Sequence, residues 1–398
     1  MSNLEELIER LCPDGVEYKS LIDLCDVLYG FPCDASNFND DMIGLPLVRI
    51  RDVLEGKSDT YTIESVPEEY KTHSGDLLVG MDGNFHVGIW KDIEAILCQR
   101  VCRISSKDND VLLDGFLNHL IGPIMKKIEL GKQSGTVKHL LAKDIKAIKL
   151  PVPPLEVQRE IVRILDNFTF LTAELAAELA ARQKQYEYYR DLLLTFKSNE
   201  STILNERTNE LELSGAIRWM KLGDIADIGT GNGNTNEGLD TGKYPFFVRS
   251  QDIKYKNEYD FDETAIITSG DGVGVGKIFH FVSGKYALHQ RAYRVHITSD
   301  NVLPKYFFYY FKNSFLTYIS KASFHSSVTS IRRPMMINFP VPVPPLVVQQ
   351  RIVDILDRFD TLCNDISSGL PAEIEMRQKQ YEYYRDKLLS FKELKKEA

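Results

Sequence analysis

The feature that most restricts how this chain of 398 residues folds is an internal duplication. Residues 182–191 read Arg-Gln-Lys-Gln-Tyr-Glu-Tyr-Tyr-Arg-Asp, and the same ten letters recur at 377–386. Upstream, Pro-Val-Pro-Pro-Leu occurs at 151–155 and again at 342–346. Chance does not produce such identity, and self-similarity marks a repeated structural unit. The chain is therefore two copies of one unit, each a globular segment followed by a long helix.

The globular segments of the two copies have diverged, although they still align. Residues 16–27 align with residues 217–228, and the Gln-Arg pair at 99–100 aligns with the Gln-Arg pair at 290–291. A protein that keeps its helices identical while its domains diverge is expected to use the helices for one repeated partner. The domains are then expected to serve two different targets.

Short β-rich runs, bounded by Gly, Asn and Asp clusters, occupy the globular segments. They fall at 45–50, 76–79 and 95–98 in the first copy and at 244–248, 265–268 and 286–289 in the second. A helical stretch closes each copy before the proline-rich hinge. This pattern predicts α+β domains, each built around a curved, mainly antiparallel sheet.

After each Pro-Pro pair the pattern changes to helix, because proline is tolerated at or before the first helical turn. Steps of three and four residues then trace a heptad seam in both copies. The seam comprises Phe168, Thr172, Leu175, Leu179, Arg182, Tyr186, Tyr189, Leu193 and Phe196, and then Leu370, Ile374, Arg377, Tyr381, Tyr384, Leu388 and Phe391. Two equal helices of this kind are expected to pack antiparallel as a coiled-coil spacer. About 27 residues at ~1.5 Å each make a rod of ~40 Å.

The seam has two interpretations. In the first, ten of its side chains form a partner interface: Leu179, Tyr186, Tyr189, Leu193, Phe196, Ile374, Tyr381, Tyr384, Leu388 and Phe391. In the second, which is favoured, the same pattern reflects packing of the two helices on each other. If they pack on each other, the outer faces of the helices are the better candidates for partners.

These elements predict five segments along the chain. Globular domains are expected at 1–150 and 216–341, helical spacers at 151–197 and 342–398, and a polar, acidic linker at 198–215.

The bulk composition narrows the class of protein. A net charge of −9 excludes a chain coated in positive charge but does not describe how the charge is distributed. Six cysteines show no paired framework, which is typical of a reducing compartment. The first residues carry acids where a secretion signal needs bases, and no run reaches the roughly 20 apolar residues of a membrane span. A cytoplasmic protein without membrane contact is expected.

No catalytic grouping recurs in both copies. Residues 269–277 resemble a phosphate loop, but Ile278 stands where Ser or Thr would hold magnesium, and Asp271 stands where the first glycine belongs. Cys98 and Cys102 lack the further His or Cys pair that would complete a zinc site. We therefore expect no catalytic residue, no metal ligand and no cofactor in this chain.

Two basic stretches lie at equivalent places in this acidic chain. Residues 125–150 carry seven Lys against two acids, and residues 304–340 carry three Lys and two Arg with no acid, so each has a net charge of +5. Attraction to phosphate requires local rather than total positive charge. Each stretch also surrounds a small polar loop whose hydroxyl and amide donors suit phosphate oxygens.

The candidate DNA-contacting residues form two groups. In and beside the basic loops they are Lys132, Ser134, Thr136, Lys138, His325, Ser326, Ser327, Thr329, Arg332 and Arg333. Candidates for reading base edges are Arg49, Arg51, Asn84, His86, Gln99 and Arg100 in the first copy, and Arg249, Gln251, Gln290 and Arg291 in the second. Each of them, taken singly, also suits a surface or structural role.

The duplicated hinge, the helix start Gln-Arg-Glu-Ile-Val-Arg-Ile-Leu-Asp at 158–166 and the duplicated ten-residue motif carry a family resemblance. Over essentially its whole length the chain resembles the DNA-specificity subunit of type I restriction-modification systems. The resemblance implies two tandem α+β target recognition domains separated by the two long helices, with pseudo-two-fold symmetry. Each domain would read half of a split target in double-stranded DNA. The divergent domains do not match the family residue by residue, so its contacts are not carried over to them.

The resemblance also implies partners. The helices would recruit two modification subunits, which bring S-adenosylmethionine and methylate adenine, and restriction subunits would add translocation and cleavage with ATP and Mg²⁺. A ~40 Å rod at ~3.4 Å per base pair would separate the two domains by roughly one turn of duplex, which predicts an unread spacer. The alternative is a non-catalytic scaffold that holds two protein partners and never touches DNA.

Overall fold

The computed structural model describes residues 2–132, 137–196, 202–204, 211–213, 217–322, 330–365 and 367–394. The chain divides into two compact units. Unit 1 comprises Met1–Leu175 together with Ile374–Ala398, and unit 2 comprises Ala176–Glu373. Each unit therefore combines the globular segment of one copy with helical residues from both copies.

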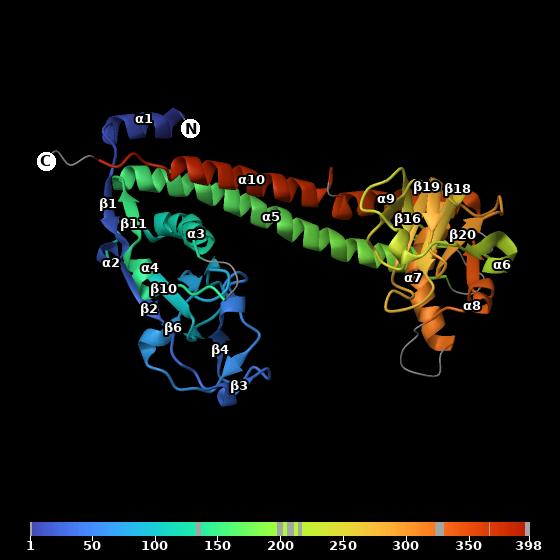
Figure 1. Cartoon of the computed structure of the whole chain (residues 1–398), viewed down its shortest axis with the longest axis horizontal. Helices are drawn as coiled ribbons and strands as arrows, with labels where there is room; N and C mark the ends of the chain where they lie inside the picture. Colours follow the sequence, from blue (N-terminus) through green and yellow to red (C-terminus); the bar gives the residue numbers. More distant parts are fainter. Residues whose placement is uncertain are drawn as a thin grey trace. The chain divides into compact units, whose positions relative to one another are not determined.

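Unit 1 is built on two main sheets and its share of the long helices (Figure 1). Its elements are α1 Ser2–Leu11, β1 Glu17–Ser20, α2 Leu21–Leu24, β2 Cys25–Tyr29, β3 Phe38–Asn39, β4 Leu45–Val48, β5 Tyr61–Thr62, β6 Lys71–Thr72, β7 Leu77–Gly80, β8 Val87–Ile89, β9 Ala95–Leu97, β10 Val101–Ser106, α3 Asp114–Leu130, α4 Ala142–Lys146 and β11 Lys149–Val152. The order β2-β10-β7-β8 makes an antiparallel sheet, and β3-β5-β4-β9-β6 makes a second sheet in which only β4 and β9 are parallel. Helix α3 packs on the first sheet through Phe116, Leu117 and Leu120, which are all buried.

Unit 2 repeats this plan with longer strands. Its elements are β12 Thr202–Leu204, β13 Leu211–Leu213, β14 Arg218–Lys221, α6 Leu222–Ile225, β15 Ala226–Thr230, β16 Tyr244–Phe247, β17 Lys254–Lys256, β18 Phe261–Ser269, β19 Phe279–Leu288, β20 Ala292–Ile297, α7 Pro304–Ala322, α8 Arg333–Ile337 and β21 Pro340–Val343. One six-stranded sheet has the order β15-β20-β18-β19-β16-β17, and only β16 and β19 are parallel in it. The predicted α+β class and mainly antiparallel sheets are confirmed.

A buried glutamine in each unit makes the duplication visible in atomic detail. The amide of Gln158 donates to the carbonyls of Pro153 and Val111 at 2.8 and 2.9 Å, and its oxygen accepts from the backbone of Leu113 at 2.9 Å. Gln349 repeats all three bonds with Pro344, Asn301 and Leu303 at 2.7, 2.8 and 2.8 Å. The proline-rich hinge is thus clamped to the preceding segment in the same way in both units.

The long helices differ between the copies. Helix α5, Leu155–Leu194, has 40 residues, whereas the second copy forms α9, Leu346–Asn364, and α10, Leu370–Leu388, of 19 residues each. The expectation of two equal helices is therefore wrong. The break after α9 is a tight turn in which the Asp365 carboxylate accepts hydrogen bonds from Ser367 and Ser368, and these bonds lower the pKa of Asp365 to about 2.

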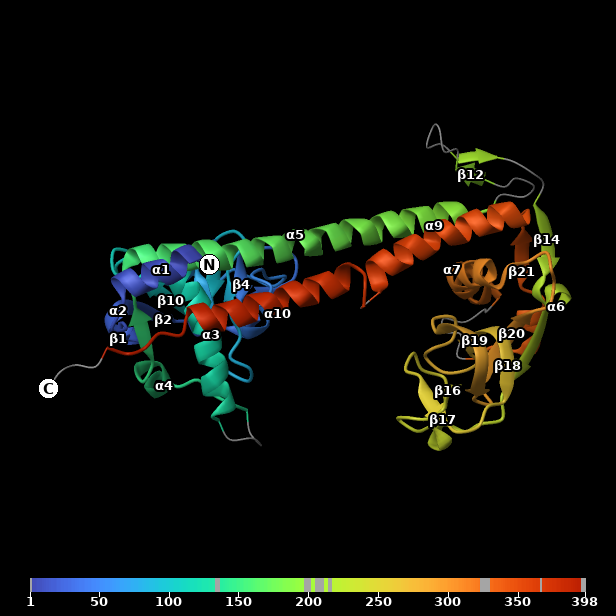
Figure 2. The ribbon, with the colours of Figure 1, turned by 90° about the horizontal axis from the view of Figure 1, so that it is seen from above.

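Within each unit, α5 packs antiparallel against a helix of the second copy (Figure 2). In unit 1, Phe168 stacks on Tyr384 of α10 with ring centroids 5.3 Å apart. In unit 2, Tyr186 and Tyr189 pack on Phe359 of α9 at 6.2 and 5.7 Å. The prediction that the seam residues pack helix on helix is confirmed for these aromatic positions.

Two seam residues lie outside the helices to which they were assigned. Helix α5 ends at Leu194 and α10 ends at Leu388, so Phe196 and Phe391 follow the helix ends. The reason in unit 1 is that the chain after α10 pairs with the segment before β1: the backbone of Val16 donates to the Lys392 carbonyl at 2.8 Å. Phe391 packs into the core of unit 1 from this extended segment, and Phe196 lies against Tyr310 in unit 2.

Among the described residues, no helix combines the length and the apolar character that crossing a bilayer requires.

Candidate nucleic-acid interface

The Gln-Arg pair that aligned in sequence forms the same tight turn in both units. In unit 1 the turn joins β9 to β10: Val101 donates to the Cys98 carbonyl at 3.2 Å, and Gln99 donates to the Phe31 carbonyl at 2.7 Å. In unit 2 the turn joins β19 to β20, and the corresponding bonds run from Ala292 to His289 at 3.0 Å and from Gln290 to Gly233 at 2.9 Å. We call residues 98–101 and 289–292 the Gln-Arg turns.

Each Gln-Arg turn is also tied to the loop that follows the neighbouring strand. The Arg100 carbonyl accepts from Met81 at 2.8 Å, and the Arg291 carbonyl accepts from Gly270 at 2.9 Å. Arg100 has a φ of 72°, in the left-handed region that a side chain such as arginine rarely adopts. Strained backbone of this kind persists where the surroundings hold it, and it is often found at functional sites.

An aspartate lies beside the arginine of each turn. In unit 1, Arg100 Nε lies 3.5 Å from the carboxylate of Asp82, whose other oxygen is 2.7 Å from His139 Nδ1. In unit 2, Arg291 Nη1 lies 3.0 Å from the carboxylate of Asp271, whose other oxygen is 2.7 Å from Arg249 Nη1. The side chains of Arg100 and Arg291 remain 61% and 62% exposed, so most of each side chain is open to solvent.

The two arginines keep Asp271 charged. Burial alone would raise the pKa of the Asp271 carboxyl, but hydrogen bonds from Arg249 and Arg291 lower it below the ordinary value. A charge-assisted pair of this kind is stronger and better oriented than a neutral hydrogen bond.

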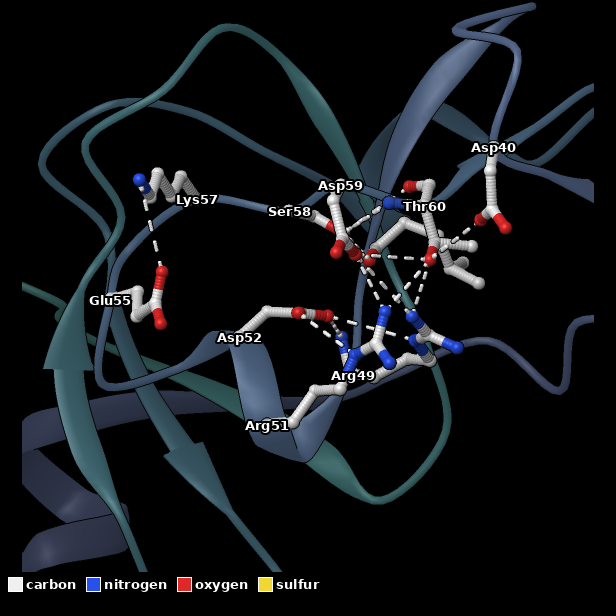
Figure 3. Close-up of polar contacts among 10 residues, drawn as sticks. Asp40, Arg49, Arg51, Asp52, Glu55, Lys57, Ser58, Asp59 and Thr60 are labelled. Carbon is white, nitrogen blue, oxygen red and sulfur yellow. Dashed lines mark hydrogen bonds and ion pairs between the residues drawn. The ribbon is translucent and has the colours of Figure 1, made fainter. Parts of the chain in front are cut away.

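Arg49 and Arg51, two further base-reading candidates, lie together in unit 1 (Figure 3). Arg49 bonds the hydroxyl of Thr60, its backbone nitrogen donates to Asp52 at 2.9 Å, and its side chain is 29% exposed. Arg51 donates to Asp59 at 2.6 Å and to Thr60 at 2.9 Å but stays 58% exposed. This geometry favours a structural role for Arg49 and leaves Arg51 reachable from solvent.

The remaining base-reading candidates lie on loops. Asn84 and His86 belong to the turn between β7 and β8, where the His86 nitrogen donates to the Asn84 carbonyl at 2.8 Å. Both residues line an open hollow with Lys126 and Lys127 of α3. Gln251 is exposed on the loop after β16, and Gln290 donates to Asn234 at 2.6 Å.

The basic stretches are partly neutralised within unit 1. Lys132 pairs with Asp144 at 2.5 Å, and Lys138 lies 3.5 Å from Glu129. Arg332 and Arg333 are exposed at the start of α8 in unit 2. Six loop candidates lie outside the described residues, namely Ser134, Thr136, His325, Ser326, Ser327 and Thr329.

The duplicated helix motif presents one tyrosine outward in each copy. Tyr188 and Tyr383 are 63% and 64% exposed, while the seam tyrosines beside them pack into their units. Each exposed ring meets its neighbour edge-on, Tyr188 with Tyr189 at 5.4 Å and Tyr383 with Tyr384 at 5.3 Å. The two copies therefore offer the same local surface.

One group of side chains has the spacing of metal ligands. Ligand atoms of Glu68, His73 and Glu94 lie within 4.8 Å of one another. The ammonium of Lys71 lies 2.8 Å from Glu68 and 3.0 Å from Glu94. Since a cation of the protein already sits between the two carboxylates, this cluster is better explained as a surface ion-pair network.

A family model described as the type I restriction modification DNA specificity domain matches the chain twice, at residues 13–182 and 217–376. The chain belongs to this family and carries two copies of its domain.

Two curated relatives illustrate the kinship. The chain is 37% identical over 273 residues to the EcoR124I/EcoR124II specificity subunit of Escherichia coli, an alignment that covers 61% of this chain and 63% of the relative. It is 36% identical over 273 residues to the putative specificity subunit S.HindORF215P of Haemophilus influenzae, covering 62% and 65%. The aligned part thus spans less than two thirds of the length of these relatives.

Solved structures agree on the fold. The type I restriction-modification S subunit from M. genitalium superposes with a TM-score of 0.59 at 14% identity, covering 94% of this chain and 96% of that one. A chain from a study of complex assembly and conformational transition of the type I R-M system gives 0.55 at 17% identity, covering 95% and 98%. At this level of identity the likeness concerns the fold alone.

Two acidic residues of the site, Asp82 and Asp271, are absent from the sequence-based candidates, because those candidates are side chains that can donate hydrogen bonds to DNA. A signal was available: each aspartate is the second residue after its strand, in equivalent loops of the two copies.

Proposed function

We propose that this chain is the DNA-specificity subunit of a type I restriction-modification complex, and that each unit reads one half of a bipartite target in double-stranded DNA. The observation that carries the proposal is the Gln-Arg turn. Two globular segments that diverge elsewhere keep an exposed arginine at the same turn, held by an aspartate at the same place. Arginine is the side chain that most often reads guanine, through a bidentate contact in the major groove.

The repeated helices suit a repeated partner. Tyr188 and Tyr383 present equal surfaces with equal sequences, which is what two copies of the same modification subunit would require. Exposed tyrosine is enriched at protein interfaces because it combines a large apolar ring with a hydroxyl. We expect restriction subunits to join this assembly.

The chain is proposed to contribute recognition and no chemistry of its own. S-adenosylmethionine, ATP and Mg²⁺ are expected on the partner subunits.

Reconstitution tests the function. The purified chain is mixed with modification subunits, labelled S-adenosylmethionine and a random DNA library, and the methylated sites are sequenced. The expected result is methylation only when all proteins are present, at a motif of two defined halves around an undefined spacer. Methylation by the chain alone would show that it is an enzyme. The absence of any salt-dependent DNA affinity, even with the modification subunits present, would favour the scaffold alternative.

A further inference from the structure

The strongest unassigned feature of both units is the aspartate next to the Gln-Arg turn. Asp82 and Asp271 each lie two residues beyond a strand of the main sheet, β7 and β18 respectively. Each forms an isolated antiparallel bridge, Asp82 with His139 and Asp271 with Ser330. Each bridge joins the strand loop to the chain just before α4 or α8. The two carboxylates thus occupy the same structural position.

The backbone around each aspartate leaves little freedom. In unit 1, Leu140 donates to the Met81 carbonyl at 2.7 Å and Gly83 donates to the Lys138 carbonyl at 2.8 Å. In unit 2, Ile331 donates to the Gly270 carbonyl at 2.8 Å. The carboxylates are only 21% and 23% exposed, whereas the arginines that they bind are mostly exposed. In each unit, a largely buried carboxylate on a constrained backbone therefore holds an exposed arginine side chain.

Each carboxylate divides its oxygens between two partners. One oxygen of Asp271 binds Arg291 and the other binds Arg249; one oxygen of Asp82 faces Arg100 and the other binds His139. Each arginine is thus contacted through one nitrogen in these pairs, and guanidinium has five N–H donors. The remaining donors are available to a ligand while the side chain is already oriented.

We propose that Asp82 and Asp271 are positioning residues that pre-orient the arginines of the Gln-Arg turns for reading DNA bases. The inference rests on the proposed function. An arginine side chain loses rotamer freedom when it makes a bidentate contact, and holding it beforehand reduces that loss at the correct target. The same carboxylate repels phosphate, so it also weakens contacts that depend on charge alone.

This dual role has a signature that simple structural support lacks. Replacing the carboxylate by an amide keeps the shape but removes the charge. Asp271→Asn is expected to weaken binding to the correct half-site by roughly tenfold, because the full side-chain freedom of arginine is worth roughly thirtyfold and the carboxylate restricts part of it. Binding to scrambled DNA is expected to rise. Loss of folding would instead lower both.

The test uses the complete modification complex and three DNA duplexes: the target found by reconstitution, the target with one half scrambled, and the target with both halves scrambled. Dissociation constants are measured by fluorescence anisotropy at one fixed salt concentration. Asp271→Asn is expected to reduce discrimination in one half only, and Asp82→Asn in the other half only. Asp240→Asn serves as the control, since Asp240 is an exposed acid of unit 2 that pairs with Lys254 at 3.1 Å rather than with an arginine of the turn.

A double-mutant cycle separates positioning from stability. If Asp271 acts through Arg291, Asp271→Asn has a much smaller effect on discrimination in an Arg291→Ala background than in the wild type. An effect that is equally large in both backgrounds, or equal losses on target and scrambled DNA, would overturn the inference. Unchanged discrimination in Asp271→Asn would overturn it as well. If the wild-type complex itself shows no preference for the target, the proposed function is what fails.

Discussion

The clamped glutamines show how single buried side chains hold each unit together. Gln349 is fully buried and satisfies the backbone N–H of Leu303 and the carbonyl of Asn301 before α7, together with the carbonyl of Pro344 in the hinge. Gln349→Leu would leave these groups without partners, and each unsatisfied buried group costs about 1–3 kcal/mol. We expect the free energy of unfolding of unit 2 to fall by about 2–4 kcal/mol, measured by urea denaturation with hydrogen exchange to assign the transition. Gln350→Leu, one exposed position further along α9, is the matched control and is expected to change it by less than about 0.5 kcal/mol.

A buried histidine makes the stability of unit 1 depend on pH. His119 of α3 bonds Asp166 at 2.9 Å and Tyr381 at 3.0 Å. Burial lowers the pKa of His119 below its ordinary 6.5, although Asp166 opposes the shift. The unfolded chain therefore binds more protons than the folded one below about pH 6.5, so stability is present above that pH and is lost as the pH falls, by at most ~1.4 kcal/mol per pH unit.

His119→Gln keeps a polar side chain but cannot titrate. The melting temperature of unit 1, followed between about pH 7.5 and about pH 5.5, should fall less steeply in the variant than in the wild type. His280 and His289, whose pKa values are also lowered first of all by burial, lie in unit 2 and are the same in both proteins. Equal slopes in the two proteins would show that His119 is not the group responsible.

At the scale of residues, the aligned sequences point directly to the arginines of the site, whereas their anchors are indicated only by the matching positions of Asp82 and Asp271 after equivalent strands. Arg100 and Arg291 stood out because the Gln-Arg pairs align. Asp271 precedes Arg291 by 20 positions, and Asp82 lies at a similar distance before Arg100, so no local pattern joins acid and base. The two residues meet because neighbouring strands pair antiparallel. This pairing places the loop after one strand, which carries the aspartate, against the Gln-Arg turn that precedes the other strand.

The elements themselves were largely predictable. Runs of β-branched and apolar residues located β4, β7, β9 and their counterparts, and the Pro-Pro pairs located the starts of α5 and α9. The helix ends were less predictable, because heptad spacing continues through Phe391 while Val16 draws the chain into an extended pairing. A contact between residues so far apart in the chain leaves no periodic trace in the sequence.

The exposed faces of the duplicated motif give a prediction at the scale of helices. Tyr188→Ala and Tyr383→Ala each remove one exposed ring while leaving the packed seam intact. Each single variant is expected to bind one modification subunit instead of two, and the double variant to bind none, measured by native mass spectrometry of the mixed subunits. Phe170→Ala, which removes another exposed aromatic ring of α5 outside the duplicated motif, is the control. Full stoichiometry in the double variant would place the docking surface elsewhere.

At the scale of the whole molecule, the compact units do not follow the order of the sequence repeats. Unit 1 takes its last helical residues from the second copy, and unit 2 begins inside the helix of the first copy. The antiparallel pairing that the sequence predicts accounts for this exchange, because each unit then contains helical residues of both copies. The unread spacer expected from a helical rod remains a prediction. Inserting four residues near Ala180, about one helical turn, is expected to lengthen the spacer in the methylated motif. An unchanged spacer would argue against the helices as its ruler.

The exchange of helices leads to a last prediction about a single repeat. A chain of residues 1–196 lacks α10, whose Tyr381 and Tyr384 contact His119 and Phe168 in unit 1. The same motif is present at the end of α5, so a second copy of the fragment can supply Tyr186 and Tyr189 at those places. Because an uncovered apolar face costs free energy in proportion to its area, we expect the fragment to form a homodimer, measured by sedimentation equilibrium. Substituting both tyrosines by alanine should yield monomers. A monomer of wild-type sequence with the full stability of unit 1 would show that α10 is dispensable for that unit.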